Sequence, residues 1–183
     1  MAVGRHDGAL SMSLQAAGRV LVAALILLAV GAPARAGTDG TTSGLPVPRF
    51  VSLKTDRVNV RGGPDKDHDV TWIYTRVGLP VEITAEFENW RRIRDSDGTE
   101  GWVYHSMLSG KRMGTVQLKS KAELAPLHAK PDAQSEVTAQ LQSGVLGAVK
   151  HCNGGWCRIS GDGFDGWIEQ NRLWGVYPNE KIE

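Results

Sequence analysis

An internal repeat constrains the fold of this chain more than any other feature. "RGGPDKDHDVT" (61–71) aligns with "HAKPDAQSEVT" (128–138) at a constant offset of 67, and both segments contain Pro-Asp and Val-Thr at matching positions. After a slip of one residue, Trp90 aligns with Trp156. A repeat at this spacing indicates that one small structural unit occurs twice.

The alignment continues to the end of each copy. After a second slip of one residue, "GWVYHSMLSG" (101–110) aligns with "GWIEQNRLWG" (166–175). We therefore expect two domains, at residues 50–116 and 117–179. Because each is close to the size at which a lone domain becomes marginally stable, we also expect the two to pack together.

The residue pattern within each copy predicts strands. Runs such as "RVNVR", "LPVEITAEF" and "GWVYH" are β-branched or alternating, and turn residues separate them. No segment after the N-terminal region sustains a helical repeat of apolar residues. The pattern predicts an all-β fold of two tandem, small, partly open barrels with five short antiparallel strands each.

The first copy resembles the bacterial SH3-like (SH3b) domain family. The resemblance rests on "NVRGGPD" followed by "NWRRIRDSDGTEGWVYHSML"; the second copy departs at its start with "PLHAKPD" but keeps "GGWCRI" and "GWI". It implies that both barrels are SH3-like and non-catalytic. Domains of this family are often attached to envelope enzymes or found alone in exported proteins, and some bind cell-wall peptides.

The N-terminal region has the parts of a secretory signal peptide. The apolar run "VLVAALILLAV" (20–30) follows Arg19 and precedes "GAPARAG". We expect a signal peptide at residues 1–36, cleaved between Ala36 and Gly37. A spanning helix needs about 20 apolar residues, so we expect no stable membrane insertion after cleavage, and a location in the periplasm or outside the cell.

The segment after the cleavage site is Gly/Thr/Pro-rich and predicts a flexible linker at residues 37–49. Met12 is an alternative to Met1 as the start of the chain, because it gives a tidier basic region before the apolar run.

The charge balance excludes nucleic acid as a partner. The whole chain carries 21 basic and 20 acidic residues, for a formal charge of +1. Removal of the signal peptide takes away three arginines and one aspartate, which leaves a charge of −1. Phosphate binding requires a concentrated basic surface, and this composition does not provide one.

The two cysteines flank a Gly-Gly pair in "HCNGGWC". If 154–155 form a type I′ turn, Asn153 lies opposite Trp156 and Cys152 lies opposite Cys157. A non-hydrogen-bonded pair of this kind brings the Cα atoms within the range that disulfides span. An exported chain is also oxidised more readily than a cytoplasmic one. We therefore predict a structural disulfide between Cys152 and Cys157.

Two alternatives are less consistent with this sequence. A redox-active pair is more typically C-x-x-C at a helix N-terminus, and a zinc site built on His151 would lack a fourth ligand. The repeat places Glu86 and Arg91 where the second copy has its cysteines, so we expect an exposed ion pair at that position of the first copy.

The aromatic residues fall into repeated and unrepeated sets. The repeated tryptophans are expected to fill the two barrels, and they are Trp90, Trp102, Trp156 and Trp167. Aromatic side chains present in one copy alone are better candidates for binding. We predict a groove on the first copy lined by Trp72, Tyr74 and Tyr104, with Arg61 and His105 at its rim. The alternative is that these aromatics pack between the domains.

The sequence shows no catalytic pattern of a known type, and we predict no catalytic residue, metal site or cofactor. The expected function is an exported, non-catalytic binding protein of the bacterial cell envelope that recognises a peptide, a cell-wall component or an envelope protein. The alternatives are a structural or assembly factor without a small ligand, and a thiol-redox accessory protein.

Overall fold

The computed structural model describes residues 41–183, which lie within one compact unit. The predicted signal peptide (1–36), its cleavage between Ala36 and Gly37, and the alternative start at Met12 all lie outside the described residues.

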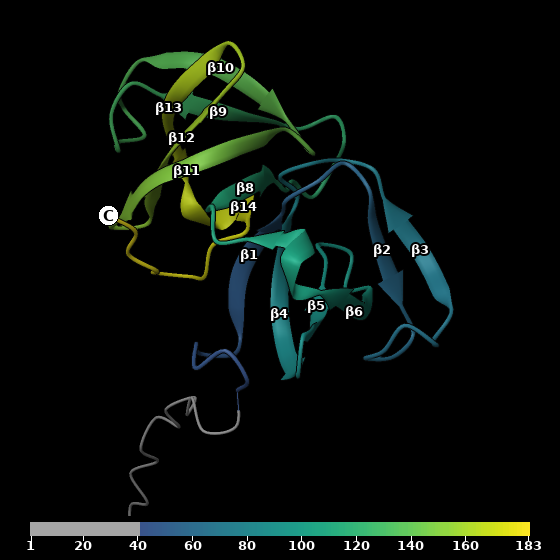
Figure 1. Ribbon diagram of the computed structural model, residues 1–183. Coiled ribbons are helices and arrows are strands. Elements are labelled where there is room, and N and C mark those ends of the chain that lie inside the picture. Colours follow the sequence, from purple (N-terminus) through teal and green to yellow (C-terminus); the bar gives the residue numbers. More distant parts are fainter. Residues whose placement is uncertain (1–40) are drawn as a thin grey trace, which may run out of the picture. The chain divides into compact units, whose positions relative to one another are not determined.

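The first copy forms a seven-stranded antiparallel sheet with the strand order β3-β2-β6-β5-β4-β1-β7 (Figure 1). Its elements are β1 (Arg49–Leu53), β2 (Val58–Arg61), β3 (Val70–Tyr74), β4 (Pro80–Phe87), β5 (Trp90–Arg94), β6 (Glu100–Tyr104), the 3₁₀ turn η1 (His105–Met107) and β7 (Leu108–Ser109). We call this part of the chain the first barrel.

The second copy forms a sheet with the equivalent order β10-β9-β13-β12-β11-β8-β14. Its elements are β8 (Met113–Val116), β9 (Leu124–His128), β10 (Val137–Gln142), β11 (Leu146–Asn153), β12 (Trp156–Gly161), β13 (Phe164–Glu169), the 3₁₀ turn η2 (Gln170–Arg172) and β14 (Leu173–Trp174). We call this part the second barrel. The repeat found in the sequence therefore corresponds to a repeat of the strand order in the structure.

The sequence prediction of five strands per copy is too low, because each sheet has seven. The two-residue strands β7 and β14 are too short to show alternation in a sequence. The prediction also assigns β8 to the first domain by ending that domain at residue 116. The hydrogen bonds of β8 are made with β11 and β14, so β8 belongs to the second sheet.

The cores of both barrels are aliphatic. In the first barrel, alternate residues of β2 point inward, and Val58 and Val60 are completely buried. The other members of this core are Val51, Leu53, Val81, Ile83, Ile93 and Val103. The second core consists of Val116, Ala125, Leu127, Leu141, Val149, Cys152, Cys157, Ile159, Ile168, Leu173 and Val176.

The repeated Gly-Trp pair is explained by a close approach of two strands. A Cβ atom on Gly166 would lie 2.8 Å from the backbone oxygen of His128 on β9. At the equivalent position, a Cβ atom on Gly101 would lie 2.4 Å from Val60. Only glycine lets β6 and β13 lie this close to their neighbours, so both copies contain it.

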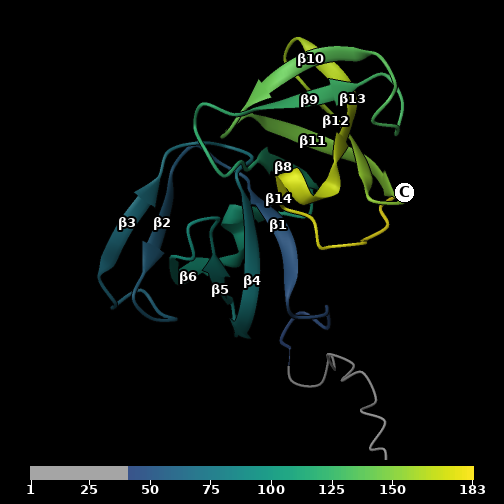
Figure 2. The same ribbon diagram turned by 180° about the vertical axis from the view of Figure 1, so that it is seen from behind.

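The two barrels pack through an aromatic cluster and a buried carboxylate. The ring of Phe50, on β1, lies 5.0 Å from the ring of Trp174 and 4.7 Å from that of Tyr177. The indole N–H of Trp174 donates to the carbonyl of Pro80, and the Tyr177 hydroxyl donates to Glu82. Figures 1 and 2 both show β8 and β14 beside β1, which is where these contacts occur.

We expect Gly166→Ala to lower the free energy of unfolding by about 1–3 kcal/mol, because the added methyl group overlaps backbone that cannot rotate away. Urea denaturation would measure the change. Gly110→Ala is the matched control, since a Cβ atom there meets nothing within 4 Å. Equal midpoints for the two variants would contradict the close-approach explanation.

Candidate functional site

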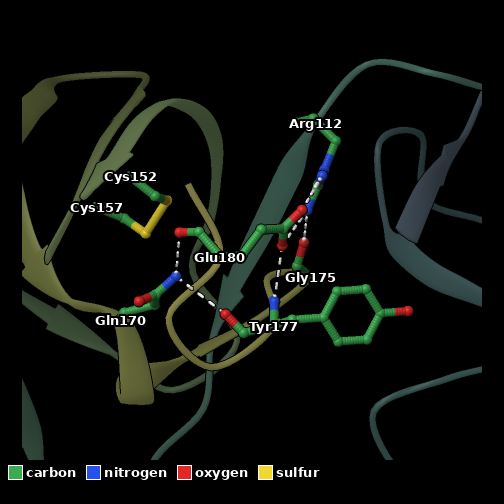
Figure 3. The surroundings of a disulfide bond; sticks show 7 residues. All are labelled: Arg112, Cys152, Cys157, Gln170, Gly175, Tyr177 and Glu180. Carbon is green, nitrogen blue, oxygen red and sulfur yellow. Dashed lines mark hydrogen bonds and ion pairs between the residues drawn. A yellow bond between two sulfur atoms is a disulfide. The ribbon is translucent and has the colours of Figure 1, made fainter. Parts of the chain in front are cut away.

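A disulfide joins Cys152 and Cys157 at the tip of the β11–β12 hairpin (Figure 3). The Cα atoms are 4.1 Å apart, and both residues are completely buried. Asn153 pairs with Trp156, as the predicted hairpin register requires. Gly154 and Gly155 between them have φ angles of 59° and 83°, which glycine adopts without strain.

The C-terminal segment covers this disulfide. Ile182 pairs with Cys152 through two backbone hydrogen bonds of 2.9 and 3.0 Å. The buried amide of Gln170 donates to the carbonyls of Tyr177 and Glu180, which fixes the path of the segment. Neither sulfur is available as a free thiolate for a metal or for thiol exchange, so the arrangement is that of a structural crosslink.

We expect the double variant Cys152→Ala/Cys157→Ala to lose about 2 kcal/mol of unfolding free energy, the amount that closing a short loop contributes. Chemical denaturation of both proteins would measure the loss. Intact mass should show the native chain lighter by two hydrogens than its reduced form. Recovery of two free thiols from the native protein would contradict the assignment.

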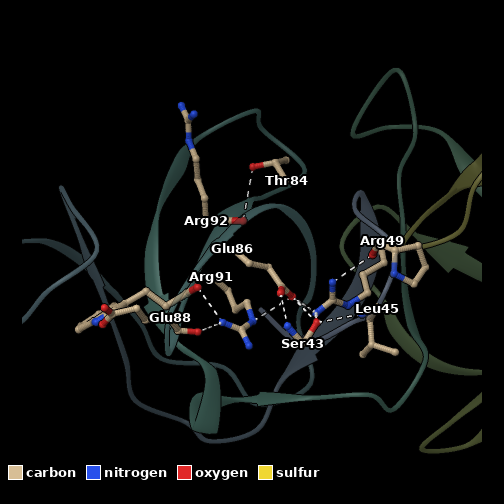
Figure 4. Close-up of polar contacts among 10 residues, drawn as sticks. Ser43, Leu45, Arg49, Thr84, Glu86, Glu88, Arg91 and Arg92 are labelled. Atoms are coloured by element: carbon tan, nitrogen blue, oxygen red, sulfur yellow. Dashed lines mark hydrogen bonds and ion pairs between the residues drawn. The ribbon is translucent and has the colours of Figure 1, made fainter. Parts of the chain in front are cut away.

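Glu86 and Arg91 occupy the equivalent position of the first barrel and form an ion pair of 3.1 Å (Figure 4). The predicted exposure is wrong: the Glu86 side chain is completely buried and that of Arg91 is 9% exposed. The reason is the preceding segment. Arg49 bonds to the same carboxylate, and Ser43 donates to it through its backbone N–H and its hydroxyl, at 2.8 and 2.7 Å.

The same contacts involve the segment at residues 37–49, which the sequence predicts to be a flexible linker. In its described part, Ser43 and Arg49 are bound to the first barrel through Glu86. Burial alone would raise the pKa of the Glu86 carboxyl. The hydrogen bonds from Ser43 and Arg49 outweigh burial and lower that pKa to about 2.

We expect Glu86→Gln to lower the free energy of unfolding by about 1–3 kcal/mol at neutral pH. The folded-state pKa lies below the ordinary value of 4.5, so the ionised carboxylate contributes its full stability above pH 4.5 and loses it as the pH falls toward 2. The difference between the native chain and Glu86→Gln should therefore shrink over that range, as measured by denaturation at several pH values.

Glu100→Gln serves as the control, because Glu100 pairs with Arg92 while both side chains are partly exposed. Such a pair contributes about 0–1 kcal/mol. A difference between the native chain and Glu86→Gln that stays constant from pH 6 to about pH 2 would contradict the role given to Glu86.

The residues of the predicted groove do not all lie together. Trp72 and Tyr74 share a face of β3, as strand alternation predicts, but that face packs against the first core. Trp72 pairs with the buried Val60, and the Tyr74 hydroxyl donates to Asp95 at 2.8 Å. Burial, together with this hydrogen bond, raises the pKa of Tyr74.

Tyr104 and Arg61 lie together at a different place, in a pocket of about 270 Å³ on the first barrel. Its lining residues are Arg57, Asn59, Arg61, Lys66, Trp90, Tyr104 and Met107. The rings of Trp90 and Tyr104 meet edge to face at 5.5 Å and form its aromatic wall. We call this pocket the cationic pocket, because three of its lining side chains are basic and none is acidic.

Two of the three cations are free to bind a ligand. Among residues 41–183, the guanidinium of Arg57 and the ammonium of Lys66 take part in no hydrogen bond or ion pair of the protein. Arg61 differs, because it donates to the carbonyls of Lys66 and His68 and so fixes the β2–β3 loop. Arg61 thus positions the loop that carries Lys66.

The second barrel does not reproduce this pocket. Trp156 is kept, but the counterpart of Tyr104 is Glu169 and that of Arg61 is His128. The His128 ring is buried and packs edge to face on Trp156 at 5.4 Å. The cationic pocket is therefore a specialisation of the first copy.

His105 lies apart from the cationic pocket, beside a shallow hollow next to Arg91 and Leu108. Its ring contacts that of Tyr104 at 5.0 Å. The prediction that the repeated tryptophans fill the barrels is confirmed for Trp90, which is buried, and wrong for Trp102, Trp156 and Trp167. Trp90 is buried, the other three are half-buried, and none belongs to either core cluster.

Sequence reasoning missed several residues. Arg57 and Lys66 carry no aromatic or motif signal that marks them in the sequence. The interface aromatics Phe50, Trp174 and Tyr177 were also missed, although the criterion applied to Trp72 and Tyr104 selects them as well. Trp174 aligns with Ser109, so this ring too is present in only one copy.

The strand order, the repeated 3₁₀ turns and the paired Gly-Trp positions define a tandem SH3-like protein. The family model described as "Bacterial SH3 domain" matches the chain twice, at residues 54–110 and 121–175. These matches cover more than half of the chain, and the protein belongs to the bacterial SH3 domain family.

One curated relative is "Putative N-acetylmuramoyl-L-alanine amidase YrvJ" of Bacillus subtilis (strain 168), which is 23% identical over 123 residues. The match covers 63% of this chain and 24% of that protein, so the chain spans about a quarter of its relative. Two solved structures, NlpC2 and NlpC1 of Trichomonas vaginalis, share 15% identity at a TM-score of 0.32. They cover 69% and 75% of this chain, and 48% of each of those chains is matched.

Proposed function

We propose that this protein is an exported, non-catalytic binding protein of the bacterial cell envelope, and that its first barrel binds a carboxylate-bearing peptide of the cell wall. The observation that carries the proposal is the cationic pocket, which combines an aromatic wall with free cations. Its absence from the second copy separates it from features that merely build the fold.

The chemistry of the pocket favours an anionic, partly apolar ligand. Arg57 and Lys66 provide positive charge that no protein group neutralises among the described residues. A guanidinium matches a carboxylate with two parallel hydrogen bonds. Tyr104 and Met107, with the buried Trp90 behind them, provide apolar surface for an extended peptide, as in other grooves that recognise such chains.

The comparisons support the cell wall as the source of this ligand. The Bacillus relative is named as an amidase of a cell-wall component, and the aligned part covers about a quarter of it. The family matches account for both barrels of the present chain. Among the described residues, no helix is long and apolar enough to cross a membrane.

The two alternatives have less support. A thiol-redox role conflicts with a disulfide that is buried beneath the C-terminal segment. An assembly factor without a small ligand gives no reason for free cations beside an aromatic wall in only one of the two copies.

Co-sedimentation with purified peptidoglycan tests the proposal. We expect Tyr104→Ala to weaken binding about tenfold, because it removes half of the aromatic wall. Arg57→Glu/Lys66→Glu should weaken binding at low salt more strongly than Tyr104→Ala does, since it reverses both free charges. Leu124→Ala is the control: Leu124 is an exposed apolar residue of the second barrel outside the pocket, and its loss should change nothing.

Binding to peptidoglycan that is equal in all of these variants would overturn the proposal. An absence of binding by the native chain would also overturn it, and would favour the assembly alternative.

A further inference from the structure

We propose that a second pocket, at the junction of the two barrels, binds an uncharged sugar chain. This junction pocket has a volume of about 420 Å³. One wall comes from the β5–β6 turn of the first barrel, at Ser96 and Asp97, and the other from the β10–β11 turn of the second barrel. It shares no residue with the cationic pocket.

Hydrogen bonds between the barrels fix the two walls. The amide of Gln117 donates to the Ser96 carbonyl at 3.3 Å, and the Arg76 guanidinium donates to the Gly144 carbonyl at 3.1 Å. A ligand here meets a preformed surface that neither barrel has alone. Small-molecule sites occur preferentially at such junctions of domains.

Trp174 gives the pocket an aromatic surface of fixed orientation. Its N–H is held by the Pro80 carbonyl at 3.0 Å, and Phe50 packs edge to face against its ring at 5.0 Å. An indole held in this way loses little conformational entropy when a ligand binds. The face of a pyranose ring that carries only C–H groups packs well on such a surface.

The polar groups around this ring suit hydroxyl and amide partners. Among residues 41–183, the side chains of Asp97, Lys121 and Gln142 line the pocket and make no hydrogen bond or ion pair with the protein. Thr115 also lines the pocket, and its buried hydroxyl bonds to no partner in the part of the chain that the structure describes. A ligand rich in hydroxyl groups offers hydrogen-bond partners to these exposed side chains and, directly or through a bound water, to the buried Thr115 hydroxyl, which is costly to leave unpaired.

The two pockets differ in the charge of their lining side chains, and we therefore expect them to bind different ligands. The junction pocket has one anionic and one cationic side chain, Asp97 and Lys121, so its lining is neutral overall. The cationic pocket has three basic side chains and no acidic one. The first arrangement fits an uncharged sugar chain, with the amide of Gln142 placed for an acetamido group, and the second fits a carboxylate.

The test uses the full chain and a soluble tetramer of N-acetylglucosamine, titrated while the indole N–H signal of Trp174 is followed by NMR. We expect saturable binding that shifts this signal. Asp97→Ala and Gln142→Ala should each weaken binding about three- to tenfold, the effect of losing one hydrogen bond. Gln140→Ala is the matched control, since Gln140 is exposed on the same strand two residues away and does not line the pocket.

The inference extends the proposed function to a second ligand, but it depends on different residues. Tyr104→Ala should leave sugar binding unchanged while it weakens peptidoglycan binding. The inference is overturned if the tetramer does not bind, if it binds both pocket variants as tightly as the native chain, or if Tyr104→Ala abolishes its binding. If instead the cationic pocket does not bind its ligand, the variants at Arg57, Lys66 and Tyr104 would bind peptide-bearing peptidoglycan as tightly as the native chain does. Binding of the sugar tetramer would not be affected.

Discussion

The buried carboxylate of Glu82 is the group on which the joining of the two barrels depends. It is 3% exposed, and a charge so buried is costly unless it is paired. Arg94 provides the charge from the neighbouring strand, and Tyr177 provides a hydrogen bond from the far end of the chain. Phe50, the cross-strand partner of Glu82, packs under the same tyrosine ring. Burial of Glu82 by Tyr177 thus ties the C-terminal segment to the first barrel.

Repeated and unrepeated residues have different roles in this protein. Repeated positions, such as Gly101 and Gly166, keep the strands in register and the cores closed. Unrepeated positions modify a scaffold that already folds. Tyr104 opens a pocket where the second barrel has Glu169, and Trp174 provides an inter-barrel ring where the first barrel has Ser109. Both pockets for which we propose ligands thus include side chains that differ between the two copies and that the core clusters do not contain.

The sequence was sufficient to predict the family, the duplication and the disulfide, because residue spacing and turn-forming residues are local features of a chain. The register of Cys152 and Cys157 follows from two glycines between them. The sequence was not sufficient to predict the candidate binding surface. Alternation showed that Trp72 and Tyr74 share a face, but not that this face is the inner one. The burial of Glu86 also escaped prediction, because it depends on Ser43, which lies 43 residues away in the sequence.

The contact between Tyr177 and Glu82 joins residues 95 positions apart, and this has a consequence for synthesis. Chains are made from the N-terminus, and domains generally fold as they emerge. The first barrel can complete its sheet long before Tyr177 exists. Until the final residues are made, it presents Phe50 and the carboxylate of Glu82 to solvent on one face. If the first barrel folds before the C-terminal segment is made, this face remains open to solvent until Tyr177 covers it.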